Sequence, residues 1–179
     1  MKNLRAARTP LPCIASALLL AACAGVPVPP EPAVVPLTTA TPQQMVASIR
    51  AAAGDGEGEL SVQPLRDPMV GDLLERAEAL HAQGDHAGEA EALDQALELA
   101  PDDPALLQER AEAAILLRDF DRANALAERA YALGGQVGPL CRRHWATIEQ
   151  VRLVAGDAEG AASAKAQVEG CKVSGPERF

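Results

Sequence analysis

The sequence predicts an all-α fold, and three observations lead to this prediction. Only four of the 179 residues are aromatic, too few for the core that a β-sandwich of this length usually contains. Alanine, the residue with the highest helix propensity, makes up roughly a fifth of the chain. Apolar residues also recur at helical spacing between residues 67 and 171, and their pattern repeats after 34 residues. We therefore expect a helical domain, preceded by segments of a different character.

The amino terminus has the composition of a signal peptide. Residues 1–22 contain Lys2, Arg5 and Arg8 but no acidic residue, and they end in an apolar stretch of about a dozen residues. This stretch is shorter than the roughly 20 residues that a membrane-spanning helix needs. The sequence Leu20-Ala21-Ala22-Cys23 resembles the bacterial lipobox, in which the chain is cleaved before the cysteine and the cysteine is acylated. The alternative is an ordinary cleavable signal peptide with an incidental cysteine.

The resemblance to lipoproteins also implies a location. A signal peptide over residues 1–22 and a lipidated Cys23 would attach the mature chain to the bacterial cell envelope. In this family an aspartate after the cysteine marks retention at the inner membrane, whereas this chain has Ala24. We therefore expect an outer-membrane lipoprotein that faces the periplasm. Several acyl chains such as palmitate, at about 0.8 kcal/mol per buried CH₂, would make the anchor permanent.

A tether is predicted between the lipidated cysteine and the helical domain, over residues 23–66. Its first part is rich in proline, which prevents helix formation and favours an extended spacer. A proline-rich docking motif for a partner is the alternative interpretation. Within the tether, Thr41-Pro42-Gln43-Gln44 has the residues of a helix start and predicts a short helix over about 42–53. The acidic glycine-rich run at 54–59 then ends this helix and is interpreted as a flexible linker.

The region from residue 67 to 171 contains an internal repeat. Shifting the chain by 34 residues places Leu73 on Leu107, and residues 75–79 on the identical residues 109–113. This period resembles that of the tetratricopeptide repeat (TPR), whose units are pairs of antiparallel helices. In the second repeat, the bulky and small positions of that family are occupied by Leu107, Ala111, Phe120, Ala123 and Ala130. The resemblance implies a short TPR-like α-solenoid of about three helical hairpins.

The first and third repeats each depart from the family pattern. In the first repeat, Glu89 lies where a small residue belongs. In the third, Trp145 and Ala161 fill the bulky and small positions once the turn at Gly156-Asp157 is aligned with the earlier turns, but Glu149 replaces an alanine. The third hairpin is therefore expected to be the least regular of the three.

Capping signals divide the repeat region into helices. Aspartate followed by proline at 67–68 and 103–104, and proline at 139, are typical of the first turn of a helix. Gly84-Asp85 and Arg118-Asp119 are typical of the turn into a second helix. In the third hairpin we expect helices from Pro139 to Ala155 and from Ala158 to about Gly170, which leaves residues 172–179 as a tail.

Two cysteines of the third hairpin are predicted to form a disulfide bond. Cys141 and Cys171 lie about 15 residues before and after the turn at Gly156-Asp157, which places both at the open end of the hairpin. In an oxidising periplasm, closing this loop would contribute roughly 3–4 kcal/mol in the chain-entropy model. The bond would also stabilise a terminal repeat that lacks a neighbour. The alternative is a zinc site formed by Cys141, His144 and Cys171, for which no fourth ligand is evident.

Charge and motifs argue against several other functions. The formal net charge of −9 at pH 7 disfavours binding to nucleic acid, because phosphate groups need basic partners. The sequence has no phosphate-binding glycine loop, no Gly-x-Ser-x-Gly motif and no His-Glu-x-x-His motif. His81 and His86 are interpreted as surface polar residues beside a turn rather than as metal ligands. We therefore expect no catalytic residue, no cofactor and no metal ion, and a metal enzyme is the third alternative.

The resemblance to the TPR family implies protein binding on the concave face, which the first helix of each hairpin lines. The groove positions of the family correspond here to Leu74, Glu78, His81, Gln108, Glu112, Ile115, Gln150 and Leu153. Chaperone-binding members use Lys and Asn at such positions to hold a terminal carboxylate, whereas this chain has Glu and Gln. We therefore expect a basic or amide-rich, partly apolar partner segment.

The leading hypothesis is a monomeric adaptor or assembly factor of the envelope that binds a protein or peptide. The alternative is a self-associating structural subunit of an envelope complex.

Overall fold

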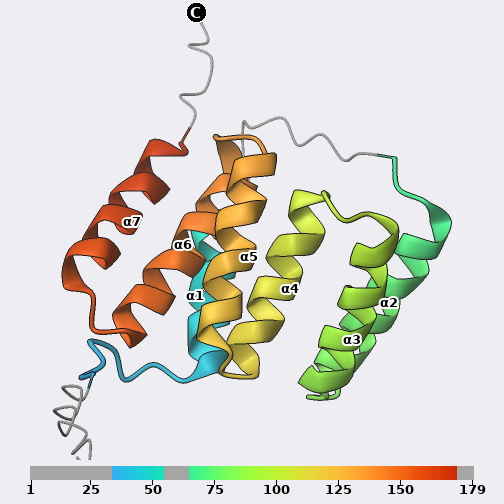
Figure 1. The fold of residues 1–179 in the computed structure, drawn as a ribbon, viewed down its shortest axis with the longest axis horizontal. Helices are drawn as coiled ribbons and strands as arrows, with labels where there is room; N and C mark the ends of the chain where they lie inside the picture. The colour runs from blue at the N-terminus through green and yellow to red at the C-terminus, as the bar shows by residue number, and fades with distance from the viewer. Residues whose placement is uncertain (1–33, 55–64, 173–179) are drawn as a thin grey trace, which may run out of the picture. The chain divides into compact units, whose positions relative to one another are not determined.

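All regular structure in the residues that the computed structural model describes, 34–54 and 65–172, is helical (Figure 1). The predicted signal peptide at 1–22, Cys23, most of the proline-rich stretch and the tail from 173 onward lie outside the described residues. Ala33–Phe179 forms one compact unit, to which all seven helices of the described residues belong. In the described part, no helix combines the length and the apolar character that crossing a bilayer requires.

Six helices pair into three successive antiparallel hairpins, so the prediction of an all-α fold is confirmed. The pairs are α2 (Pro68–Ala82) with α3 (His86–Leu99), α4 (Pro104–Leu116) with α5 (Phe120–Leu133), and α6 (Gly138–Val154) with α7 (Ala158–Gly170). Each hairpin also packs on the next, through α3 with α4 and through α5 with α6 (Figure 1).

The three hairpins share one turn geometry, which explains why the third hairpin keeps the pattern despite its different length. The second residue before the start of the second helix adopts a positive φ in each case: Gly84 at 76°, Arg118 at 62° and Gly156 at 73°. An aspartate follows and accepts a hydrogen bond from the backbone N–H three residues later. This side chain satisfies one of the free N–H groups at the start of α3, α5 and α7.

Alanine provides the contact surfaces between the hairpins. Ala111, Ala113 and Ala114 of α4 are fully buried, and so are Ala127 of α5 and Ala164 of α7. Helices with such short side chains can approach each other closely, which compensates for the shortage of aromatic residues. The central helix α4 is buried along almost its whole length because it contacts α3, α5, α6 and α1.

The predicted disulfide bond is present. Cys141, near the start of α6, is bonded to Cys171, at the end of α7, with 5.8 Å between their Cα atoms. Both residues are buried, and the backbone N–H of Gly138 donates a hydrogen bond of 2.7 Å to the carbonyl of Cys171. The alternative zinc site is excluded, since the two sulfur atoms bind each other and His144 bonds elsewhere.

The short helix predicted within the tether exists as α1 (Pro42–Ala52), but its assignment to a tether needs correction. Thr41 and Gln44 form the expected capping box at its start. Met45, Val46 and Ile49 are buried in one cluster with residues of α4 and α6, against which α1 packs (Figure 1). The physical reason is the apolar face of α1, which gains free energy when it is removed from water.

Candidate partner-binding groove

The first helices of the hairpins, α2, α4 and α6, carry the eight residues predicted to bind a partner, and α1 divides this set. The α4 residues Gln108, Glu112 and Ile115 are fully buried. On α6, Gln150 and Leu153 are half-buried, and the carbonyl of Leu153 accepts a 2.8 Å hydrogen bond from the N–H of Leu37. Only the α2 residues Leu74, Glu78 and His81 line an open cavity.

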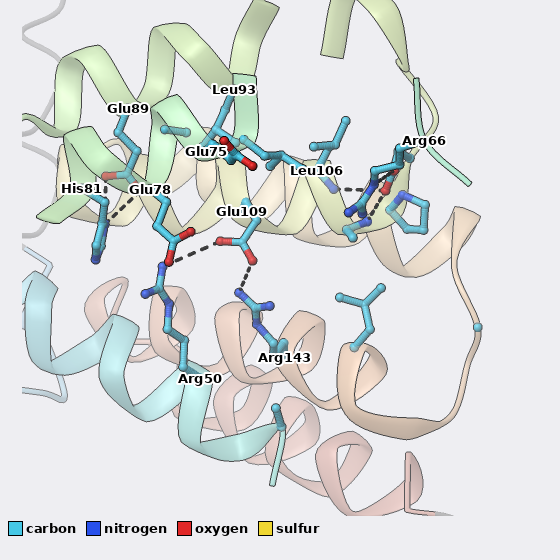
Figure 2. Close-up of a pocket in the computed structure, with 18 of the residues that line it drawn as sticks. Arg50, Arg66, Glu75, Glu78, His81, Glu89, Leu93, Leu106, Glu109 and Arg143 are labelled. Carbon is cyan, nitrogen blue, oxygen red and sulfur yellow. Dashed lines mark hydrogen bonds and ion pairs between the residues drawn. The ribbon is translucent and has the colours of Figure 1, made fainter. Parts of the chain in front are cut away.

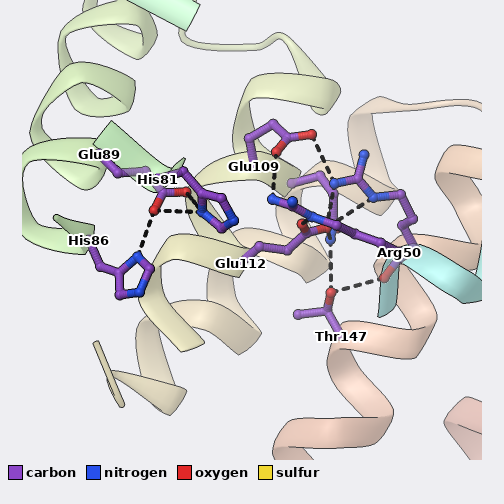
Figure 3. A network of polar contacts seen from close by, with 9 residues as sticks. Arg50, His81, His86, Glu89, Glu109, Glu112 and Thr147 are labelled. Atoms are coloured by element: carbon purple, nitrogen blue, oxygen red, sulfur yellow. Dashed lines mark hydrogen bonds and ion pairs between the residues drawn. The ribbon is translucent and has the colours of Figure 1, made fainter. Parts of the chain in front are cut away.

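Glu112 is the centre of a polar network beneath α1 (Figure 3). Its carboxylate is completely buried and accepts hydrogen bonds from Arg50 Nε at 2.8 Å and from Arg143 Nε at 2.9 Å. Gln108 Nε2 donates a third, at 2.9 Å. Since a buried charge needs such partners, the basic residue of α1 completes the environment of this glutamate.

Gln108 extends the network to two further side chains of α6. Its Nε2 also donates to the hydroxyl of Thr147, and its carbonyl oxygen lies 2.7 Å from Nδ1 of His144. Burial, together with the smaller effect of the neighbouring positive charge of Arg143, lowers the pKa of His144 to about 4. His144 is therefore neutral at pH 7, with Nδ1–H as the donor to Gln108.

Arg143 connects the buried network to the open cavity. It pairs with the buried Glu112 and, at 2.8 Å, with the half-buried Glu109. Burial alone would lower the pKa of Arg143, but the two carboxylates outweigh this effect and raise it above its ordinary value. The guanidinium therefore remains charged and holds α4 and α6 together.

Hydrogen bonds to backbone groups connect both ends of the segment that contains α1 to α6. Arg142 donates hydrogen bonds to the carbonyls of Ala52 and Ala53, which are free acceptors at the end of α1. Before α1, the chain bonds to the end of α6 through Leu37. While α1 is docked, Gln108, Glu112 and Ile115 cannot contact a partner, which corrects the prediction for these three residues.

An open cavity of about 1010 Å³ remains beside α1, between α2, α4 and the start of α6 (Figure 2). Apolar side chains from four helices and one loop contribute to its lining: Leu74, Ala77, Leu93, Leu106, Val137 and Leu140. A mainly preformed cavity with apolar walls and charged residues at its edge is suited to holding an apolar side chain of a ligand.

Charged side chains around most of this cavity form ion pairs, whereas the glutamates of α2 form none within the described residues. Arg50 and Arg143 approach Glu109 from the side opposite α2 (Figure 2), and across the cavity Arg66 pairs with Asp103 at 3.0 Å. Burial would raise the pKa of Asp103, but the hydrogen bond and charge of Arg66, with two backbone N–H donors, lower it overall.

On α2, Glu75 and Glu78 are exposed, and neither forms an ion pair or hydrogen bond within residues 34–54 and 65–172. The α2 side of the cavity therefore has uncompensated negative charge.

One group of polar residues was missed by the sequence interpretation. His81 and His86 are half-buried rather than simply on the surface, and both direct Nδ1 to the carboxylate of Glu89, at 2.9 and 3.1 Å (Figure 3). Glu89 itself is only 3% exposed. The signal was its place in the repeat, since a charged residue at a small, buried position requires polar neighbours.

Comparisons with known proteins identify one similar structure. No protein-family model and no curated protein matches the chain. Among solved structures, the chain is similar to the globular C-terminal domain of P. aeruginosa LpoP, a lipoprotein, with 28% sequence identity and a TM-score of 0.55. The match covers 59% of this chain and 99% of the LpoP domain. This chain therefore contains the helical arrangement of nearly the whole LpoP domain, together with residues beyond it.

Proposed function

We propose that this chain is a lipid-anchored protein of the bacterial envelope whose helical domain binds a protein partner as an adaptor or assembly factor. The lipobox-like sequence ending at Cys23 and the similarity to a lipoprotein domain support the envelope location. The 34-residue period and the three hairpins support a TPR-like mode of binding along the first helices. Ala24 supports the outer membrane, with the domain on the periplasmic side.

The open cavity beside α2 is the observation that carries this proposal. Its apolar lining fits a segment that has both apolar and basic side chains, and so do Glu75 and Glu78, which have no ion-pair partner among the described residues.

The helix α1 provides an internal example of such a segment. It places Met45 and Ile49 in the core beside α4, and its Arg50 pairs with Glu112, the residue equivalent to Glu78 in the next repeat. No helix of the described part of the chain occupies the equivalent position on α2, where a partner helix with the same chemistry could bind.

Site-specific photo-crosslinking in living cells tests this proposal. A photoreactive residue at Leu74, which lines the cavity, should give a specific crosslink to one protein, identified by mass spectrometry. The matched control position is Leu99, an apolar residue on α3 that is 49% exposed and lies away from the cavity. Identical products from both positions would contradict the proposal.

Charge reversal adds a second criterion. Glu78→Lys should reduce the crosslink from Leu74, because it removes the charge that attracts a basic segment. Glu98→Lys, which makes the same change on the exposed face of α3, should leave it unchanged. A crosslink to a second copy of the chain, with a dimer in sedimentation experiments, would instead favour the self-associating structural subunit.

A further inference from the structure

Three residues with metal-binding side chains meet at the turn of the first hairpin. The nearest ligand atoms of His81, His86 and Glu89 all lie within 4.8 Å of one another. His81 Nδ1 is 2.9 and 3.0 Å from the two carboxylate oxygens, and His86 Nδ1 is 3.1 Å from the second (Figure 3). Two elements, the end of α2 and the start of α3, hold the three side chains around one point.

Comparison with the other hairpins shows that these residues replace an apolar contact. At the same positions, 34 residues later, the second hairpin has Ile115, Phe120 and Ala123, all of which belong to or pack against one hydrophobic cluster. Alignment of the turns gives Leu153, Ala158 and Ala161 in the third hairpin. The first hairpin thus exchanges three apolar residues together for two imidazoles and a carboxylate, the side chains that bind transition metals.

We propose that His81, His86 and Glu89 form a binding site for a divalent transition metal ion, of which Zn²⁺ fits the donor set best. Two imidazole nitrogens and one carboxylate oxygen are typical zinc ligands. Zinc–ligand bonds of about 2.0–2.2 Å in a tetrahedron separate the ligand atoms by roughly 3.3–3.6 Å. The present distances of 2.9 to 3.1 Å from the two Nδ1 atoms to the carboxylate oxygens therefore need to increase by roughly 0.2–0.7 Å. The ligand atoms of all three residues already lie within 4.8 Å of one another.

The surroundings leave space for a fourth ligand. The side chains of His81 and His86 are 30% and 19% exposed. Both line a second cavity of about 580 Å³ that lies between α1 and the turn at Gly84. His81 also lines the open cavity beside α2. Three protein ligands would leave one tetrahedral position of the metal open to water from these cavities. This inference does not depend on the proposed partner binding.

Metal titration of the full-length chain, purified without a polyhistidine tag and treated with a chelator, tests the site. We expect one equivalent of Zn²⁺ to bind in calorimetry, and Co²⁺ to give the visible absorption bands of a tetrahedral complex. Loss of a second-shell partner alone lowers metal affinity by about 10–100-fold, so Glu89→Gln or His81→Ala should weaken zinc binding at least tenfold. The absence of saturable zinc binding at micromolar concentrations would overturn the proposal.

Two controls separate metal binding from a purely structural role of the three residues. Glu91→Gln makes the same change on an exposed glutamate of the same helix and should not alter zinc affinity. Zinc should also raise the melting temperature of the wild-type chain but not that of Glu89→Gln, provided that circular dichroism shows both to be folded. Equal zinc affinity in wild type and in Glu89→Gln would mean that the cluster is only a hydrogen-bonded group.

Discussion

Glu78 and Glu112 lie at the same position of two successive repeats, within the identical pentapeptides 75–79 and 109–113, yet their environments are opposite. Glu78 is exposed and unpaired in the described part of the chain, whereas Glu112 is fully buried and bound by two arginines. The difference comes from α1, which covers α4 and α6 but leaves α2 open. The surface formed by α2, α4 and α6 thus has a covered half, on which α1 packs, and an open half beside α2.

The same surface chemistry therefore serves two purposes in this fold. In the covered half, glutamate and apolar residues stabilise the fold by binding a basic, amphipathic helix of the same chain. In the open half, the same residue types remain accessible to another molecule.

The largest difference is expected from removing the two equivalent glutamates. Glu112→Ala leaves Arg143 without its buried partner and should destabilise the fold by about 3–5 kcal/mol. Glu78→Ala, at the matching exposed position, should change the stability by less than about 0.5 kcal/mol. Urea denaturation of both variants measures the two values, and similar losses would show that the two halves are not distinct.

The apolar face of α1 gives the next effect. Ile49 is completely buried, so Ile49→Ala should cost about 3 kcal/mol through lost burial and the remaining cavity. In Ile49→Ala, exchange of the backbone amide hydrogens should accelerate more in α1 than in α3. Ser48→Ala on the exposed side of α1 is the control. Unchanged protection of α1 in Ile49→Ala would contradict its role in covering the groove.

Low pH should reduce the free energy of unfolding through His144, which lies in the covered half. Its pKa is lowered from 6.5 to about 4 in the fold, so between these values the unfolded chain binds a proton that the folded chain does not. The contribution of His144 to the free energy of unfolding is therefore constant above pH 6.5 and falls as the pH decreases toward 4, by up to about 3 kcal/mol.

His144→Asn retains a donor for Gln108 but cannot titrate. It should flatten the dependence of the unfolding free energy on pH between 6.5 and 4. The carboxylates titrate in both proteins, so the difference between the two profiles reports His144. Parallel profiles would show that this residue is not the source of the acid sensitivity.

The smallest effect concerns two equivalent turn glycines. Gly84 and Gly156 both have a positive φ, which costs an alanine roughly 1–2 kcal/mol. A Cβ atom at Gly84 would have no neighbour within 4 Å, but at Gly156 it would lie 2.8 Å from the carbonyl oxygen of Val35. Gly156→Ala should therefore be the more destabilising variant in thermal unfolding. Equal losses would mean that residues before α1 do not pack against this turn.

Local signals explain how much of the fold could be predicted. The aspartate caps and prolines mark the helix starts because they act on the nearest backbone groups. The pairing of Cys141 with Cys171 follows from equal distances along two antiparallel helices. The 34-residue period identifies the hairpins because each unit buries its small residues in the same way.

Contacts between distant segments could not be predicted in this way. The sequence makes Glu78 and Glu112 equivalent, and no local signal indicates which of them α1 covers. The spacing of Met45, Val46 and Ile49 is a sign of a buried helix face, but it does not identify the surface that buries it. Similarly, the unusual Glu89 is visible in the repeat, whereas its two histidine neighbours become evident only in the folded hairpin.

The helices, their caps, the repeat and the disulfide pair could be predicted from the sequence, because they depend on propensities and spacings within a short stretch of chain. The tertiary structure decided where α1 docks, and with it which glutamate is buried and which part of the groove stays open. The physical reason is that burial of an apolar helix face and completion of a buried ion pair depend on surfaces far apart in the chain, which only folding brings together.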